Sequence, residues 1–251
     1  MSAGLMSAGL MSAGLMKPVW ALLLVSSLAA AEPRSFTHTF EYPTLAADAT
    51  DVQLWHRNVI RDAGVQGGES VEDELQVGFG VADQIEADVI AEVNGDGGSL
   101  TFTSLRGEVR ARLADRGELP IDFAVHAGGG KEFDVRVYDA YARLVLAHDF
   151  DRVSLAATGQ VLFRLGADAP AAKRQYDGAA GITYEVAPRF HAGLEAWGTV
   201  DTDGRHTHSY ELGPAVAVRA SPNLWLALSA GFGLTAESND FDGRLILGFA
   251  R

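Results

Sequence analysis

Beyond about residue 50, the chain alternates apolar and polar residues in segments of roughly ten, each followed by a turn. One such segment covers residues 75–81 and the next covers residues 85–93, with a tight break at 82–84 between them. Successive side chains of a β-strand point to opposite faces, so each segment has one apolar face and one polar face. The pattern therefore predicts an antiparallel sheet with an oily side and a charged side.

The same alternation continues to the end of the chain and predicts about twelve strands. The predicted strands are 51–60, 73–81, 85–93, 100–113, 121–127, 138–146, 153–164, 176–186, 190–197, 209–219, 224–235 and 244–249. After residue 31, no apolar run approaches the length of a transmembrane helix.

The connections between these strands alternate in length. Short connections are centred on residues 83–84, 115–119, 149–151, 187–189 and 221–223. Longer connections, richer in glycine and charge, cover residues 62–71, 94–99, 128–134, 166–174, 201–207 and 237–240. Transmembrane barrels have short periplasmic turns and longer external loops. An even number of strands then places both ends of the barrel on the periplasmic side.

Aromatic residues on the apolar faces gather near the two ends of the strands, as in the interfacial girdles of membrane barrels. Those near the long loops are Tyr138, Phe163, Tyr176, Tyr210 and Phe232. Those near the short turns are Phe79, Phe123, Tyr184, Phe190 and Phe249. Between these two bands the apolar faces carry Leu, Val and Ala, which suits a hydrocarbon layer.

The first 31 residues are expected to be a secretory leader. They contain three copies of Met-Ser-Ala-Gly-Leu, then Lys17, the apolar run 19–25 and the small residues Ala29–Ala31. This order is typical of an export signal that is cleaved, here after Ala31. The predicted organisation is thus a signal peptide at 1–31, a periplasmic lead-in at 32–50 and a transmembrane barrel at 51–251.

Together these features make the chain resemble the outer-membrane β-barrel proteins of Gram-negative bacteria, of the kind with roughly twelve strands. The resemblance covers about Val52 to Arg251, and the strand-turn phrase Leu75–Gln84 is similar to one in uncharacterised members. It implies a closed, up-and-down all-β barrel integral to the outer membrane. It also implies contact with outer-membrane lipids and lipopolysaccharide, and insertion by the barrel-assembly machinery. Such proteins usually end on an aromatic residue, whereas here Phe249 is followed by Ala250 and Arg251.

Composition narrows the choice of partners and of alternative folds. The formal net charge is −13 at pH 7, which argues against a nucleic-acid partner. The chain has no cysteine, so an exported form must be stabilised by packing or by a membrane. A soluble β-sandwich or lipocalin-like barrel is the alternative fold, and it would bury the apolar faces instead.

If lipid contacts the apolar faces, the charged faces line the lumen. The predicted lumen-lining residues are Glu86, Asp88, Glu92, Arg106, Glu108, Arg110, Arg112, Asp122, Asp139, Arg143, Arg164, Glu185, Glu195, Glu211 and Arg244. Opposite charges on neighbouring strands attract, and low-dielectric walls strengthen that attraction. The lumen is then either a narrow passage for small polar solutes or a space that ion pairs fill and hold shut. A barrel closed in this way would act through its external loops, as a structural or surface-interaction protein.

A lipid-active enzyme is the remaining class of function. A Ser–His pair on one strand face needs the spacing i, i+2, and no His-x-Ser occurs. His126 and Asp139 could meet from neighbouring strands. His206 and His208 share a face and could hold a metal, but no third ligand is evident. The sequence therefore predicts no catalytic residues, no metal and no cofactor.

Overall fold

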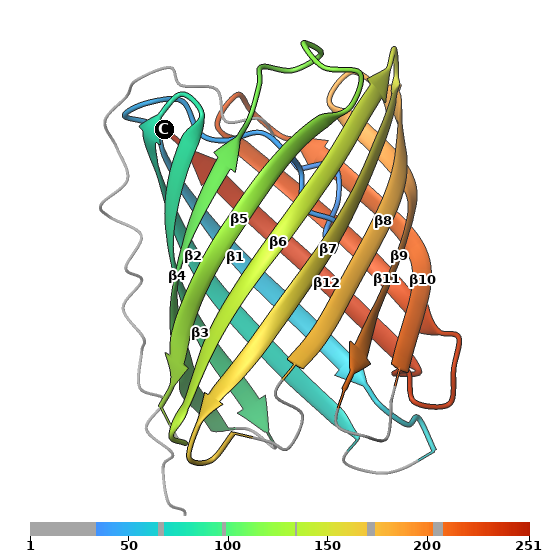
Figure 1. Ribbon diagram of the computed structural model, residues 1–251. Helices are drawn as coiled ribbons and strands as arrows, with labels where there is room; N and C mark the ends of the chain where they lie inside the picture. The colour runs from blue at the N-terminus through green and yellow to red at the C-terminus, as the bar shows by residue number, and fades with distance from the viewer. Residues whose placement is uncertain (1–33, 65–67, 97–98, 134, 170–173, 203–207) are drawn as a thin grey trace, which may run out of the picture.

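Twelve antiparallel strands close into a single barrel in the computed structural model, which describes residues 34–64, 68–96, 99–133, 135–169, 174–202 and 208–251 (Figure 1). The strands are β1 (Thr50–Ile60), β2 (Glu69–Ala82), β3 (Ile85–Asp96), β4 (Ser99–Arg112), β5 (Asp122–Glu132), β6 (Val137–Phe150), β7 (Val153–Gly166), β8 (Arg174–Ala187), β9 (Phe190–Asp201), β10 (His208–Arg219), β11 (Leu224–Gly233) and β12 (Phe241–Ala250). The predicted fold class is confirmed.

The barrel is closed by pairing between its first and last strands. Each strand pairs with the next along the chain, and β1 pairs with β12 in a register that sets Leu54 opposite Leu247. Thr50 and Arg251 exchange backbone hydrogen bonds at 2.9 and 2.8 Å beside this seam. Closure leaves no sheet edge with unpaired backbone groups, which is the requirement for a β-structure in lipid.

The outer surface carries the apolar side chains of the alternating pattern. Leu54, Leu75, Val89, Val109 and Leu228 all expose at least 40 % of their surface. Seven of the ten predicted girdle aromatics are exposed large side chains: Phe79, Tyr138, Phe163, Tyr176, Tyr184, Tyr210 and Phe232. The other three are partly buried: Phe123, Phe190 and Phe249. So continuous an apolar surface is unfavourable in water, whereas it suits the hydrocarbon layer of a membrane.

The two ends of the barrel differ in most of their connections, as predicted, but not in all of them. The predicted short connection between β4 and β5 covers residues 113–121, the predicted long one between β3 and β4 covers 97–98 alone, and most of the predicted loop 128–134 belongs to β5. At one end, here called the short-turn end, β2 and β3 are joined through Asp83 and Gln84 alone, and the chain finishes at Arg251. At the other, the long-loop end, β1 and β2 are joined through residues 61–68. Among the described residues, no helix is long and apolar enough to cross a membrane.

The start of the described chain lies inside the barrel. Arg34–Phe40, here called the luminal segment, enters from the short-turn end, and Phe36, Thr37 and Thr39 are at most 1 % exposed (Figure 1). The sequence predicts a periplasmic lead-in at residues 32–50. Arg34–Phe40 differ from that prediction, because they lie in the lumen. Their aromatic and hydroxyl side chains match the inner wall, which buries them. The predicted leader at 1–31 lies outside the described residues.

A charged side chain on the outer face should destabilise the barrel most at the middle of the membrane and least near its surfaces. Leu228 is at the middle of β11 and 40 % exposed, so Leu228→Arg should cost ~2–4 kcal/mol of unfolding free energy. Leu234, just beyond β11 at the long-loop end, is the matched control, and Leu234→Arg should cost about 0–1 kcal/mol. Urea titrations of the refolded protein in lipid vesicles measure both. Equal costs at the two positions would contradict the assigned lipid face.

Candidate functional site in the barrel lumen

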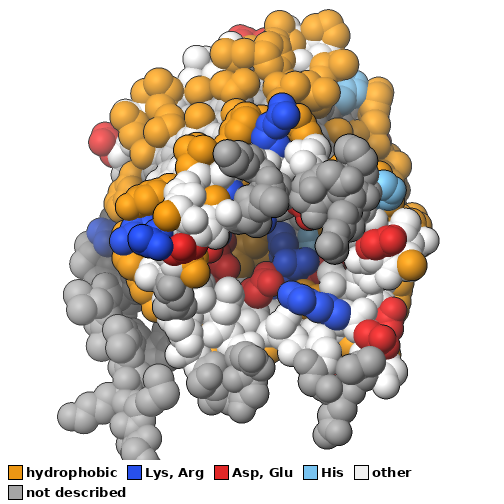
Figure 2. Space-filling model, turned by 60° about the horizontal axis from the view of Figure 1, so that its bottom comes forward, with side chains coloured by type: hydrophobic (Ala, Val, Ile, Leu, Met, Phe, Trp, Pro, Cys, Tyr) orange, Lys and Arg blue, Asp and Glu red, His pale blue; other side chains and the backbone are white. Residues whose placement is uncertain are grey.

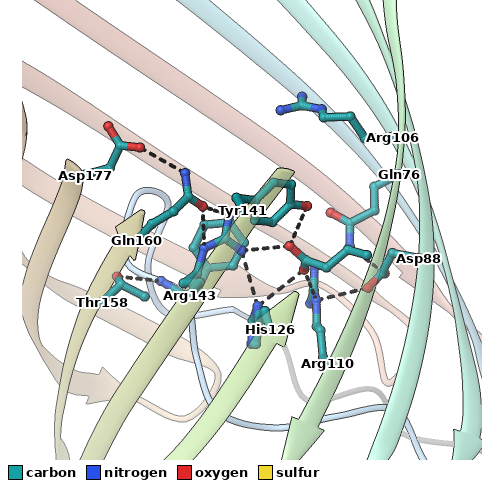
Figure 3. Close-up of polar contacts among 12 residues, drawn as sticks. Gln76, Asp88, Arg106, Arg110, His126, Tyr141, Arg143, Thr158, Gln160 and Asp177 are labelled. Carbon is teal, nitrogen blue, oxygen red and sulfur yellow. Dashed lines mark hydrogen bonds and ion pairs between the residues drawn. The ribbon is translucent and has the colours of Figure 1, made fainter. Parts of the chain in front are cut away.

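Inward-facing residues of β3 to β8 form a continuous row of polar contacts around the lumen. The strand register sets Glu86 opposite Arg110, Arg110 opposite His126, and His126 opposite Arg143. The row then passes from Arg143 to Gln160 and from Gln160 to Asp177 on the next two strands. Figure 3 shows the part of this row from Arg110 to Asp177, with its side chains directed into the same region of the lumen. Strand pairing therefore places these six polar side chains side by side on six neighbouring strands.

Arg110 of this row forms the centre of a polar cluster together with Glu108 of the same strand. Arg110 Nε lies 2.7 Å from Glu108 Oε1 and 3.0 Å from Asp88 Oδ2, and Arg110 Nη1 lies 3.4 Å from Glu86 Oε1. The second Glu108 oxygen accepts from Tyr141 Oη at 2.8 Å and from Arg143 Nη1 at 3.1 Å. The Arg110, Asp88 and Glu108 side chains are at most 6 % exposed. Charges removed from water in this way need their partners, since each unpaired ion would be costly.

Two further ion clusters lie toward the long-loop end. Arg106 Nη2 contacts Glu74 at 2.9 Å and Glu92 at 2.8 Å. Arg57 contacts Glu72 and the fully buried Asp242, both at 2.8 Å. Figure 2, turned toward this end, shows the resulting mixture of acidic and basic side chains within a hollow. Apolar side chains cover the outer wall in the upper part of the same view.

Glu195 of β9 holds the luminal segment by its backbone. Glu195 Oε2 accepts hydrogen bonds from Thr37 N at 2.9 Å and Thr37 Oγ1 at 2.8 Å. Glu195 Oε1 accepts from His38 N at 2.9 Å and Thr39 N at 2.8 Å. Thr37 Oγ1 also lies 2.6 Å from Ser229 Oγ, and because its one proton goes to Glu195 it accepts from the serine hydroxyl. The carboxylate is 0 % exposed, so its charge is compensated chiefly by these donors.

Aromatic contacts fix the side chains of the luminal segment. Phe36 packs in a socket of small and branched residues from β5 to β8, together with Gly181. The residues that pack with it include Ala124, Val145, Ala147 and Ala156. A Cβ at Gly181 would lie 2.5 Å from the Phe36 ring, so only glycine leaves the ring its space.

The next two aromatic rings of the segment stack on the wall. The His38 ring lies 3.6 Å from the Trp197 ring at an interplanar angle of 6°. The Arg143 guanidinium lies 3.5 Å from the centroid of the Phe40 ring, a favourable cation–π distance. Burial, with Arg244 and Arg57 as further causes, lowers the pKa of His38 well below its ordinary value. The stacked imidazole is therefore neutral near pH 7.

Arg34 marks the end of the segment nearest the short turns. Its guanidinium lies 4.9 Å from the Phe40 ring centroid and 4.7 Å from that of Trp55. Burial, and to a smaller degree Arg110, lowers the pKa of Arg34 to about 10, which still leaves it charged at pH 7. The segment is thus a loop whose tip at Thr37–Thr39 meets Glu195 and whose base lies near Arg110.

Separate cavities lie on the two sides of the luminal segment, besides a smaller one of about 150 Å³ beside Ser35 and Phe36. The cavity at the short-turn end has a volume of about 920 Å³ and is lined by Arg34, Asp51, Glu86 and Arg110, among others. The cavity at the long-loop end has a volume of about 470 Å³ and includes His38, Phe40 and Trp197 in its wall. The two have no lining residue in common. Each could hold a small polar molecule, and the segment lies between them.

The structure brings some of the sequence-predicted lumen residues together and leaves others apart. Those in the central ion cluster are Glu86, Asp88, Glu108, Arg110 and Arg143. Glu92 and Arg106 form the second cluster. The residues in the wall of the long-loop cavity include Asp139, Arg164 and Arg244.

The remaining predicted residues lie near the barrel ends or face the luminal segment. Asp122 accepts from Gly117 N at 2.9 Å, and Glu211 accepts from Asn239 N at 3.3 Å, so both bind loops. Arg112 donates to Asp83 O and Thr44 Oγ1 at the short-turn mouth. Glu185 is partly buried near the short-turn end of β8.

The suggested meeting of His126 with Asp139 is wrong. The register sets His126 opposite Arg143 and sets Asp139 opposite Gly130, four residues further along each strand. That separation is roughly 13 Å at the usual strand rise. His126 instead lies 3.3 Å from Glu108. Of the two histidines considered as a metal pair, His206 lies outside the described residues, and no group of three or more candidate ligands occurs among the described ones.

Sequence reasoning missed the luminal segment as part of the site, together with Tyr141 and Gln160. A signal for the segment exists, since Phe36, His38 and Phe40 follow one another at a spacing of two. That spacing gives an extended chain an aromatic face. The spacing thus predicts that the segment packs on another surface, but it does not identify that surface.

Comparison with solved structures identifies the architecture. The COG4313 outer membrane channel from Pseudomonas putida F1 is similar with a TM-score of 0.63 and 11 % identity, over 84 % of this chain and 98 % of that one. The KdgM porin in complex with disordered oligogalacturonate gives a TM-score of 0.54 at 11 % identity, over 80 % and 97 %. The NanC porin gives 0.51 at 12 % identity, over 80 % and 98 %.

The fold is that of an outer-membrane channel. No protein-family model and no curated protein sequence matches the chain. The likeness to the three solved structures therefore shows the fold at identities of 11 to 12 %. The chain therefore has the closed β-barrel fold of these outer-membrane porins and channels, with an apolar outer belt and a polar lumen.

Proposed function

We propose that this barrel is a passive, non-enzymatic channel for small polar solutes and that the luminal segment closes it in the conformation described here. The observation that carries the proposal is the division of a polar lumen into cavities of about 920 and 470 Å³ by a single stretch of chain. The likeness to channels and porins supports passage as the general role. Outer-membrane lipids would contact the belt, and the long loops would face outward.

The luminal segment can leave without damage to the sheet. Arg34–Phe40 precede β1 and take no part in the strand ladder. Residues 44–47 are held to the short-turn end, since Thr44 Oγ1 donates to Asp83 O, Leu45 N to Glu86 Oε2 and Ala47 N to Asp83 Oδ1. The segment would therefore swing toward the short-turn mouth about residues 41–43, once its bonds to Glu195 are broken.

A permanently sealed barrel is the second candidate, and one observation favours it. Glu195 is fully buried and accepts four hydrogen bonds from the segment, and Phe36 is 1 % exposed. Contacts of this quality could hold the segment in place throughout the life of the protein. The barrel would then act through its external loops.

Deletion of Arg34–Phe40 distinguishes the two candidates. In planar bilayers the deletion variant should carry a steady single-channel current, because the segment between the two cavities is gone, while the intact protein should be closed most of the time. Slower electrophoretic mobility after boiling would show that the variant is folded. A folded deletion variant with no ion current would overturn the channel and favour the sealed barrel.

A further inference from the structure

The inner wall around Glu195 recognises features that any peptide has. It binds three consecutive backbone N–H groups, those of Thr37, His38 and Thr39, through one carboxylate. Arg244 Nη1 donates to the backbone oxygen of Thr37 at 3.2 Å, so a carbonyl of the same stretch is recognised as well. None of these four contacts depends on which side chains the peptide carries.

Two neighbouring features add a preference for aromatic side chains. The Phe36 socket is lined by Ala124, Val145 and Ala156, and its floor at Gly181 has room for a flat ring but not for an added Cβ. The Arg143 guanidinium covers the Phe40 ring at 3.5 Å. A free sugar has hydroxyl donors for the carboxylate but no aromatic ring for the Phe36 socket. A free inorganic anion would be repelled by the buried charge of Glu195.

We propose that this wall is a binding site for short peptides that carry an aromatic residue, and that the luminal segment is its built-in occupant. The inference rests on the proposed function, because a peptide can bind this wall only when the segment has left it. A tethered segment competes at an effective concentration in the millimolar range. A free peptide would therefore bind weakly to the closed barrel, and it would take the place of the segment on the wall, so that the lumen opens only when the peptide leaves in turn.

The test uses the barrel that lacks Arg34–Phe40 and the fluorescently labelled heptapeptide Arg-Ser-Phe-Thr-His-Thr-Phe, which has the sequence of the missing segment. Fluorescence anisotropy in detergent should show saturable binding at least tenfold tighter than to the intact protein. A peptide with alanine in place of the first phenylalanine should bind at least tenfold more weakly. A neutral trisaccharide should not compete.

Gly181→Ala in the deletion barrel tests the same contact from the side of the wall, as the alanine-containing peptide tests it from the side of the ligand. It fills the socket and leaves Glu195 in place, so it should weaken the heptapeptide at least tenfold and should barely affect the alanine-containing peptide. If the deletion barrel proves difficult to refold, the full-length Phe36→Ala barrel is the second protein, because its own segment lacks the ring that fills the socket. It should bind the heptapeptide at least tenfold tighter than the unaltered protein does, and it should bind the alanine-containing peptide no tighter.

The outcomes separate this inference from the channel itself. A deletion barrel that conducts but binds no peptide, or that binds both peptides equally, overturns the peptide site and leaves the channel standing. Specific peptide binding by a barrel that never conducts overturns the channel and keeps the site. Equal binding to intact and deletion barrels places the peptide elsewhere and overturns the inference.

Discussion

Glu195→Gln is expected to raise the open probability of the channel at least about a hundredfold. The two carboxylate oxygens accept four hydrogen bonds from the luminal segment, three of them from backbone N–H groups. An amide keeps one acceptor and turns an NH₂ group toward the other donors. Hydrogen bonds to a charged group contribute about 1.5–3 kcal/mol each, so losing two costs ~3 kcal/mol or more. At about 1.4 kcal/mol per factor of ten, the ratio of docked to open conformations falls about a hundredfold.

Single-channel recording in planar bilayers measures this change. Glu211→Gln is the matched control, because Glu211 is also a buried glutamate on a neighbouring strand but binds Asn239 of a loop. The control variant should stay closed as the unaltered protein does. An equal response of the two variants would show that general loosening of the lumen, rather than release of the segment, produces the current.

Arg110→Met is expected to destabilise the folded barrel by ~3–5 kcal/mol. Arg110 lies within 3.4 Å of three carboxylates, those of Glu86, Asp88 and Glu108. Methionine matches much of the side-chain volume but leaves these buried negative charges with less compensation. From the alternating pattern alone, a change at this position would be expected to alter the lumen and spare stability. The burial of the cluster reverses that expectation.

Urea unfolding of the refolded protein in lipid vesicles measures this cost, with Arg136→Met as the control. Arg136 also pairs with a carboxylate, that of Asp168, but its side chain is 77 % exposed. Exposed pairs contribute roughly 0–1 kcal/mol, so the control should change stability little. Similar unfolding midpoints for both variants would mean that the luminal ion cluster does not contribute to stability.

Most of the barrel could be predicted from the sequence because a membrane barrel obeys a period of two throughout. Lipid outside and charge inside force alternation along strands such as Ile85–Asp96, and the loop lengths follow from the two sides of the membrane. Because each strand pairs with the next along the chain, the sequence also predicts which strands lie beside a charged strand. Arg106 and Arg110 do contact acids on β3, as that adjacency suggests.

The details of the site depend on register, which the pattern leaves open. A shift of one residue changes the face of every side chain, and a shift of two changes every partner. His126 and Asp139 were separated in this way, and Asp122 binds a turn at Gly117 rather than the arginines of β4. The luminal segment escaped prediction for another reason. Its aromatic face matches many surfaces, and only the folded barrel provides the one with Glu195 at its centre.

The most direct test of the central claim is a reversible tether between the segment and the wall. Thr37 Oγ1 and Ser229 Oγ lie 2.6 Å apart, so Thr37→Cys with Ser229→Cys should form a disulfide, and the chain has no other cysteine. In the Glu195→Gln background, the current should vanish on oxidation and return when a reductant breaks the bond. A current that is the same in both redox states would contradict a channel closed by its own luminal segment.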